Sequence, residues 1–476
     1  MKKLRSPVGT AREAFSAGRN AVTTKLTIAV VLLLLLIVTA AFALERQPNQ
    51  TYRARREALA KKANGAPILV FATTESDLTE VLTGFRQDED FWYLTGVNEP
   101  GAAVLIVPAL DAEALKAANA QLPPGRPATL KPRAYSEVLL LPQRNRAAER
   151  WTGPKLGPDD PEAKTATGFD RIVAIDALRD ELAKVVSPLG GVVLVNEGKD
   201  SKLALDWLKH GNLSVYSRDA RPLIASLRAV KDAGEIELIR KATDASVEAH
   251  LAAWKAIKPG ASERQIAALM VYEYERRGCE RPAYGPIVGS GFDSTVLHYD
   301  EDSGPINDGD VIVMDVGGEY SMYATDITRT VPANGEFTPR QRELYDIVLG
   351  AQQAAIRAFR SGKSVLSGRD ENSLFMAAYD YIDSHGKDLH GQPLGQYFIH
   401  GVSHMVGLNV HDPGGEGKPL GPGMVFTIEP GIYIPEEKIG VRIEDTFLVD
   451  GGGKLVSLSE KLPKTAEEIE RYMAGR

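Results

Sequence analysis

Short apolar runs with turn residues at their ends recur between residues 66 and 196 and predict buried strands. They are APILVFA (66–72), GAAVLIVPAL (101–110), SEVLLLP (136–142) and GGVVLVN (190–196). The segment IDALRDELAKVV (175–186) instead repeats its apolar residues at helical spacing. This mixture predicts an α/β domain, which we place at residues 45–218.

The pattern changes after Ser217, where long helical periods begin. One predicted helix carries an apolar face made of Ile236, Ile239, Val247, Leu251, Trp254 and Ile257. Ser262 with Gln265, and Thr338 with Gln341, are the capping-box pairs that open two further helices. Strand pairs lie between and after these helices. We therefore predict a second, larger α/β (α+β) domain at residues 219–476.

The N-terminus has a different character, because residues 26–44 carry no charge and read LTIAVVLLLLLIVTAAFAL. Six basic residues and one acidic residue precede this run. A basic flank, an apolar run and small residues at its end are typical of an export signal, and the run is also about long enough to span a bilayer. We predict that residues 1–44 are a signal peptide or membrane anchor, with an exported product that is periplasmic, secreted or anchored through residues 26–44.

Composition and charge exclude two classes of function. The formal net charge is −7, whereas a nucleic-acid-binding protein needs a basic face. The single cysteine, Cys279, cannot form an internal disulfide and fits no thiolate zinc motif. Neither a nucleic-acid partner nor thiol chemistry is expected.

A first pair of acids lies in GDVIVMDVGGEYSMYATDITRTVP (309–332), which predicts a hairpin. Pairing Asp315 with Asp326 centres the turn between Tyr320 and Ser321 and puts both carboxylates on one side of the sheet. Directly opposed like charges destabilise a sheet, so a cation between them would account for the placement. The alternatives are a different register, or one aspartate that faces solvent.

A second pair lies in MVFTIEPGIYIPEEKIGVRIEDTFLV (424–449), also a predicted hairpin. Glu429 and Glu444 stand inside its apolar arms, and Arg442 shares a strand face with Glu444. A buried carboxylate costs several kcal/mol unless it is paired or bound to a metal. A solvated face is the weaker alternative, because bulky apolar residues flank both acids.

Three of the eight histidines of the chain, His400, His404 and His411, lie within FIHGVSHMVGLNVHD (398–412). Four carboxylates and one imidazole suit two divalent ions bridged by carboxylates and a water. Such a pair supplies hydroxide and polarises a carbonyl, which is hydrolase chemistry. The remaining histidines, with His298 in STVLHYD, are candidates to contact substrate and the developing oxyanion.

These motifs, in this order, resemble the pita-bread-fold metallopeptidases, and the segment RQDEDFWYLTGVNEPGAAVLIV (86–107) is similar to aminopeptidase P. The resemblance implies a smaller N-terminal α/β domain followed by a pita-bread catalytic domain. It implies a hydrolase that removes the N-terminal residue from peptides with proline in second position, assembled as a homo-oligomer.

The resemblance also implies roles for individual residues. The metal ligands would be Asp315, Asp326, His404, Glu429 and Glu444, with manganese as the usual metal. The catalytic residues would be His298, His400, His411, Glu429 and Arg442, with Glu429 handling the proton of the attacking water.

Two other functions stay open at this point. A prolidase, which cleaves Xaa-Pro dipeptides, is the alternative within the same family. A catalytically inactive pita-bread binding scaffold is the alternative from another class, and the five intact ligand positions argue against it.

Overall fold

The computed structural model describes residues 44–75, 84–113, 115–116, 132–186, 191–196, 198, 215–369 and 371–475. Apart from Leu44, the predicted export or anchor segment at 26–44 lies outside the described residues. Within the described ranges, no helix is both long and apolar enough to cross a bilayer.

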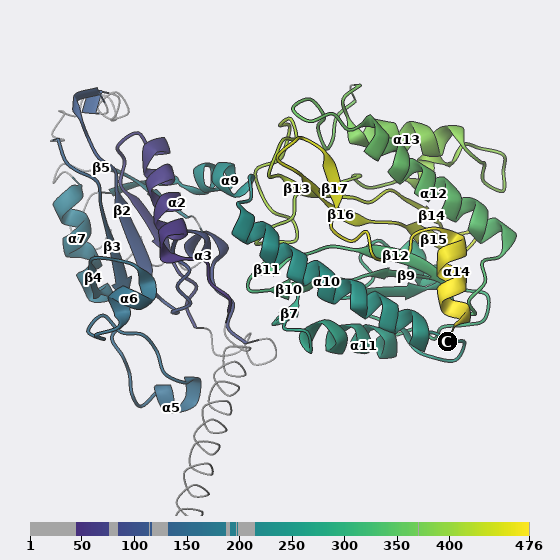
Figure 1. The fold of residues 1–476 in the computed structure, drawn as a ribbon, viewed down its shortest axis with the longest axis horizontal. Helices are drawn as coiled ribbons and strands as arrows, with labels where there is room; N and C mark the ends of the chain where they lie inside the picture. Colours follow the sequence, from purple (N-terminus) through teal and green to yellow (C-terminus); the bar gives the residue numbers. More distant parts are fainter. Residues whose placement is uncertain are drawn as a thin grey trace, which may run out of the picture. The chain divides into compact units, whose positions relative to one another are not determined.

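A mixed six-stranded sheet organises the first part of the chain, with strand order β4-β3-β2-β1-β5-β6 (Figure 1). Strand β2 runs antiparallel to both of its neighbours, whereas β4, β5 and β6 are parallel to theirs. The strands are β1 (Ile68–Phe71), β2 (Ala103–Val107), β3 (Ser136–Leu141), β4 (Ile172–Ala174), β5 (Gly191–Val195) and β6 (Val215–Asp219). The four predicted strands are confirmed as β1, β2, β3 and β5. Strands β4 and β6 are too short or too polar to stand out in the sequence.

Short helices accompany this sheet. They are α2 (Asn49–Lys62), α3 (Glu89–Thr95), α5 (Glu149–Thr152), α6 (Ala163–Thr167) and α7 (Leu178–Val185), with a 3-10 turn η2 (Ile175–Ala177) before α7. The helix predicted at 175–186 is therefore confirmed as η2 and α7. The sheet ends with β6 at Asp219, and the next helix begins at Arg221. Our domain boundary between residues 218 and 219 stays a prediction.

The second part of the chain places strands between helix pairs (Figure 1). Its helices are α9 (Arg221–Arg228), α10 (Ala233–Ala256), α11 (Glu263–Glu275), α12 (Pro339–Ala358), α13 (Leu374–Ser384) and α14 (Ala466–Ala474). Its 3-10 turns are η3 (Gly291–Thr295) and η4 (Leu394–Tyr397). The strands are β7 (Arg281–Pro282), β8 (Ile287–Ser290), β9 (Val311–Asp315), β10 (Gly318–Tyr320), β11 (Tyr323–Ala324), β12 (Thr328–Pro332), β13 (Val425–Ile428), β14 (Gly431–Ile434), β15 (Ile439–Arg442), β16 (Asp445–Val449) and β17 (Leu455–Ser457).

The helix starts follow the predicted capping chemistry. Ser262 and Gln265 form a reciprocal capping box at the start of α11, and Thr338 and Gln341 form another at the start of α12. These side chains satisfy backbone N–H groups that have no partner within the helix. One core joins α10, α11, α12 and the strands, and Trp254 of the predicted apolar face is fully buried in it.

The hairpin register that we predicted for the two aspartates is wrong: the turn centre lies one residue later, so the partner of Asp315 shifts by two positions. Asp315 lies opposite Thr328, and the turn is centred between Ser321 and Met322. Both turn residues adopt positive φ angles, 50° and 74°. A two-residue turn of this kind matches the twist of the strands. Gly317 lies outside the turn, at a close approach of the two arms where an added Cβ would lie 2.0 Å from the Thr325 carbonyl oxygen.

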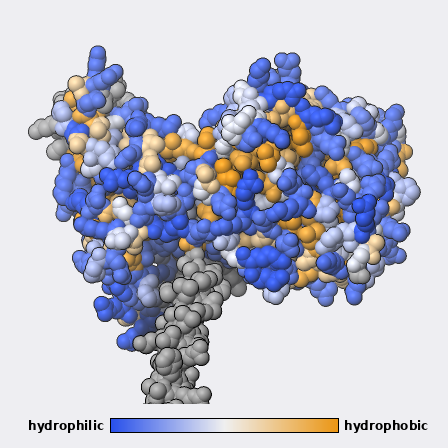
Figure 2. All heavy atoms as spheres, viewed as in Figure 1, coloured by the Kyte–Doolittle hydropathy of each residue, from blue (hydrophilic) through white to orange (hydrophobic). Residues whose placement is uncertain are grey.

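The visible face of the molecule is mostly hydrophilic, with an apolar area near α9 and β13 and smaller apolar patches elsewhere (Figure 2). Charged residues make up 25% of the chain, and a surface of this kind is where they are expected to lie.

We predict that Gly440→Ala lowers the free energy of unfolding by about 1–3 kcal/mol, the usual range for overpacking. Gly440 lies in β15, and an added Cβ would sit 1.8 Å from the Ser294 carbonyl oxygen of η3, which cannot move without shifting that turn. Chemical denaturation measures the change. Gly451→Ala is the control, because nothing lies within 4 Å of its added Cβ. Equal stabilities of the two variants would contradict the close approach.

Candidate active site

A cavity of about 440 Å³ collects most of the residues predicted to carry chemistry. Its lining includes His298, Asp315, Asp326, His400, His404, His411, Glu429 and Arg442. Glu444 lies against this group with only 1% of its surface exposed. The structure therefore brings together all nine predicted site residues from segments more than a hundred positions apart.

Interruptions in the strands hold the four acids. Strand β9 ends at Asp315, and Asp326 stands two residues before β12 begins. In the other hairpin, Ile428 of β13 pairs with Asp445 of β16. Glu429 and Glu444 are the next residues on the two arms, where the ladder is broken. Each acid thus sits at a point where its carboxylate can turn into the cavity while the flanking strands remain hydrogen-bonded.

The histidine segment runs beside β13. The His404 carbonyl accepts a hydrogen bond from the Thr427 N–H at 2.9 Å, and the Val402 carbonyl accepts one from the Glu429 N–H at 2.8 Å. The His404 ring points its Nδ1 at the Met405 carbonyl oxygen, 3.1 Å away. With Nδ1 as the donor, Nε2 is left as the basic nitrogen that faces the acids.

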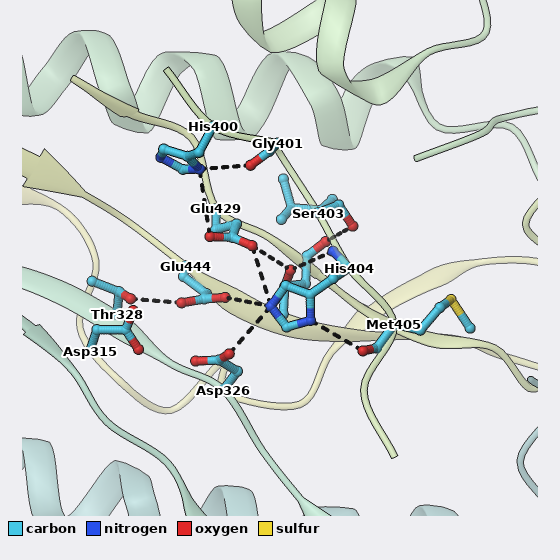
Figure 3. A network of polar contacts seen from close by, with 12 residues as sticks. Asp315, Asp326, Thr328, His400, Gly401, Ser403, His404, Met405, Glu429 and Glu444 are labelled. Carbon is cyan, nitrogen blue, oxygen red and sulfur yellow. Dashed lines mark hydrogen bonds and ion pairs between the residues drawn. The ribbon is translucent and has the colours of Figure 1, made fainter. Parts of the chain in front are cut away.

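Three carboxylates surround that nitrogen (Figure 3). His404 Nε2 lies 3.3 Å from Asp326 Oδ2, 3.4 Å from Glu429 Oε1 and 4.0 Å from Glu444 Oε1. Ligand atoms of Asp326, His404 and Glu444 all fall within 4.8 Å of one another, which is compatible with a shared metal ion. Asp315 belongs to the same cavity but makes its ion pair with Arg442, at 2.7 Å.

Burial and mutual repulsion shift the pKa values of the acids apart. Desolvation raises the pKa of Glu429 to about 7, and together with the neighbouring carboxylates it raises the pKa of Glu444 well above its usual range. Burial and the Asp315 charge raise the pKa of Asp326. Burial acts in the same direction on Asp315, but the Arg442 charge and the Tyr284 hydroxyl outweigh it and lower the pKa.

The pKa values of three histidines are also shifted in different directions. Burial lowers the pKa of His404, but Asp326 and Glu429 outweigh burial and raise it to about 9. Burial and the Arg442 charge lower the pKa of His400 to about 4, so its ring is neutral at physiological pH. The His411 ring lies 4.3 Å from the His404 ring, and burial followed by the His404 charge lowers the His411 pKa.

Tyr284 is a site residue that sequence reasoning missed. Its hydroxyl lies 2.6 Å from Asp315 Oδ1 and also contacts Asp326 Oδ1. A phenol has one proton and can donate to only one carboxylate at a time. The second contact therefore needs a proton on Asp326 or a cation nearby. The segment around Tyr284, RPAYGP, contains no periodicity or motif that would have identified it.

Tyr433 was also missed, although strand alternation could have found it. Gly431 pairs with Arg442, so Tyr433 lies on the same face as Arg442. Arg442 Nη1 donates to the Tyr433 hydroxyl at 2.8 Å, and that hydroxyl lies 2.9 Å from His400 Nε2. This chain of hydrogen bonds fixes the orientation of the neutral His400 ring.

The residues present fit divalent metal ions. Glu444 Oε2 accepts a hydrogen bond from the Thr328 hydroxyl at 2.6 Å, whereas Glu444 Oε1 is buried and has no hydrogen-bond partner. An unsatisfied buried carboxylate oxygen is costly, and this one faces His404 Nε2. Oxygen donors with one imidazole are the ligand set of hard or borderline cations.

Comparisons with known proteins identify the family of this chain. Residues 52–193 match the aminopeptidase P N-terminal domain, and residues 237–451 match metallopeptidase family M24. The Xaa-Pro aminopeptidase of Escherichia coli is 34% identical over 462 residues, covering 90% of this chain and 98% of the relative. The Xaa-Pro dipeptidase of Pyrococcus furiosus is 38% identical over 251 residues, covering 52% of this chain and 66% of the relative.

Solved structures of aminopeptidase P have a fold similar to that of this chain. Zinc-substituted E. coli aminopeptidase P in complex with product has a TM-score of 0.75 and 32% identity, covering 90% of this chain and 99% of that one. The predicted two-domain pita-bread aminopeptidase P fold is thereby confirmed. With matches across both domains and at this level of identity, the chain belongs to the Xaa-Pro aminopeptidases of metallopeptidase family M24.

Proposed function

We propose that this enzyme is a two-metal exopeptidase that releases the N-terminal residue from peptides whose second residue is proline. The observation that carries the proposal is the group of three carboxylates around His404 Nε2 at 3.3, 3.4 and 4.0 Å, inside a cavity that three further histidines line.

The ligand set would be Asp315, Asp326, His404, Glu429 and Glu444. Two divalent ions held by these residues supply activation of a water molecule and polarisation of the scissile carbonyl. Manganese is our choice of metal, because the site is rich in oxygen donors and has no thiolate. The buried, unsatisfied Glu444 Oε1 supports binding at this position.

Glu429 would act as the general base and acid. Burial raises the pKa of Glu429 to about 7 before any cation binds, and a carboxylate placed here can take a proton from the attacking water and return it. The proton is delivered to the proline nitrogen, which must be protonated before it can leave. Thr427 orients this carboxylate by donating to Glu429 Oε1 at 3.2 Å.

The histidines that line the cavity would hold the substrate. His400 is fixed through Tyr433 and Arg442, whereas His298 and His411 are more exposed on the cavity lining. Donors placed where negative charge develops on the carbonyl oxygen lower the barrier. A peptide bond to proline has no N–H, so recognition must come from the carbonyl oxygen and the ring.

A prolidase is the second candidate, favoured by the 38% identity to an Xaa-Pro dipeptidase over the catalytic half. Matching of the N-terminal domain to aminopeptidase P favours our first proposal. Turnover of Gly-Pro compared with longer peptides that begin Gly-Pro, using manganese-loaded protein, separates them. Cleavage of the longer peptides supports the aminopeptidase, and cleavage of the dipeptide alone would reverse the assignment.

We further propose that the enzyme is exported and homo-oligomeric. The uncharged run at 26–44 behind a basic leader supports export. Cell fractionation with N-terminal sequencing tests export and signal cleavage, and light scattering measures the oligomeric state. A full-length chain that stays in the cytoplasm would refute export.

We predict that Asp326→Ala reduces kcat far more than tenfold, because a carboxylate 3.3 Å from His404 Nε2 would be lost from the metal cage. Steady-state kinetics on a Gly-Pro-containing tripeptide measure the effect. Asp244→Ala, which breaks only an exposed ion pair with Lys461, is the control and should retain full kcat. A loss below tenfold, about 1.4 kcal/mol, would remove Asp326 from the ligands.

We predict that a chelator abolishes turnover, that Mn²⁺ restores it, and that Mn²⁺ binding at pH 7 releases roughly one to two protons. His404, with a pKa of about 9, is protonated at pH 7 and must lose that proton to bind a cation. Affinity should therefore rise from pH 7 to 9 and fall below pH 7, where Glu429 also becomes protonated. Calorimetry in buffers of different ionisation enthalpy counts the protons. Full activity of metal-free protein would overturn the assignment.

A further inference from the structure

A buried charge network is joined to the histidine segment through Asp412. Arg228, the last residue of α9, donates from Nη1 to Asp90 Oδ1 at 2.7 Å and from Nη2 to Asp412 Oδ1 at 2.5 Å. Lys231 Nζ donates to Asp412 Oδ2 at 3.0 Å. The side chains of Arg228, Lys231 and Asp412 are at most 5% exposed. None of these four residues was singled out by the sequence, and none contacts the proposed ligands through its side chain.

Asp412 organises the segment that begins at His404. Its N–H donates to the Met405 carbonyl at 2.8 Å, and its Oδ1 accepts the Asn409 N–H at 3.2 Å. Gly407 packs so closely that an added Cβ would lie 2.5 Å from Asp412 Oδ2. Asp412 therefore closes the loop between His404 and His411 into one unit, with the two imidazoles 4.3 Å apart at their centroids.

The other end of the network belongs to the N-terminal part of the chain. Asp90 lies in the first turn of α3, the helix that contains the FWYLT sequence. A second contact comes from just ahead of α3, where Arg86 Nη2 donates to the Leu408 carbonyl of the same loop at 2.7 Å. Arg86 is itself held by Glu319 at 2.8 Å. Helix α3 and the residues before it thus reach the His404–His411 loop at two points.

A buried network of paired charges restricts its side chains to one arrangement. Removing one partner of a buried ion pair leaves an uncompensated charge, so the remaining groups rearrange to find new partners. A planar guanidinium that donates to two carboxylates at once fixes the direction as well as the distance between them. Any rearrangement of Arg228 would therefore be transmitted to Asp412 and to the loop that Asp412 closes.

We infer that Asp90 and Arg228 are positioning residues for catalysis: the Asp90–Arg228–Asp412 bridge lets the N-terminal part of the chain set the position of the His404–His411 loop. The inference rests on the proposed function for its kinetic consequences. Placement of the loop is a separate property that can be measured without turnover.

The test replaces Asp90 with Asn, a change of nearly constant size that removes the charge facing Arg228. We expect kcat for a Gly-Pro tripeptide to fall about tenfold with little change in KM, because the misplaced groups are those that act on the bond being broken. Arg228→Met should lose more, and Arg228→Lys should recover part of the loss. The full-length, zinc-loaded protein has only eight histidines, so imidazole ¹H–¹³C NMR signals of His404 and His411 can be assigned with single variants.

Glu181→Gln is the matched control, since it too exchanges a buried carboxylate for an amide. The Glu181 side chain is 7% exposed, lies in α7 and pairs with Arg171 at 2.5 Å and Lys184 at 2.7 Å. Neither partner belongs to α3 or to residues 404–412. We expect Glu181→Gln to lower Tm as much as Asp90→Asn does, while the kinetics and the two histidine signals stay those of the parent protein.

Two outcomes would overturn the inference. One is an Asp90→Asn variant that loses Tm yet keeps kcat and both histidine signals, since the bridge would then only stabilise the fold. The other is a Glu181→Gln variant that shifts the histidine signals equally. If the parent protein cleaves no Xaa-Pro peptide, the proposed function fails, and the NMR comparison still decides whether the bridge positions the loop. If Arg228→Met does not fold, Asp90→Asn alone gives the answer.

Discussion

Repulsion among four acids is the constraint on which the catalytic half of this protein depends. Asp315, Asp326 and Glu444 are each less than 10% exposed, and Glu429 stands beside them. Carboxylates so close together cannot all be ionised without compensation. The structure compensates them with the Arg442 guanidinium, the Tyr284 hydroxyl and a protonated His404. These partners leave Glu444 Oε1 unsatisfied, and a divalent cation bound there would satisfy it.

The fold tolerates the repulsion among these acids because they lie at interruptions of the strands and not within continuous strands. The ladder between β9 and β12 and the ladder between β13 and β16 satisfy the backbone on one side of each break. The carboxylates are then fixed by short backbone segments with little freedom. A site placed on rigid strands in this way holds its ligands more closely than one built on loops.

The histidine segment is the part of the site that is not itself in a strand, and it is supported from two directions. Backbone hydrogen bonds to β13 hold one side, from the Thr427 and Glu429 N–H groups to His404 and Val402. The buried charges of Arg228, Lys231 and Asp412 hold the other. This second support extends to α3, so a domain with none of the proposed metal ligands can still influence the chemistry.

The sequence by itself determined the residue chemistry and much of the local structure. Apolar runs predicted β1, β2, β3 and β5, and the Ser262 and Thr338 capping boxes predicted two helix starts, because these signals depend on neighbours a few residues away. The motifs around Asp315, His404, Glu429 and Glu444 identified the family.

What the sequence could not decide depends on contacts between distant segments. The aspartate hairpin turned one residue later than predicted, with Ser321 and Met322 in the positive-φ conformation that the turn requires. Tyr284 is 31 positions from Asp315, and Arg228 is 138 or more positions from Asp90 and from Asp412. No local sequence pattern predicts contacts at these separations, and only tertiary packing forms them.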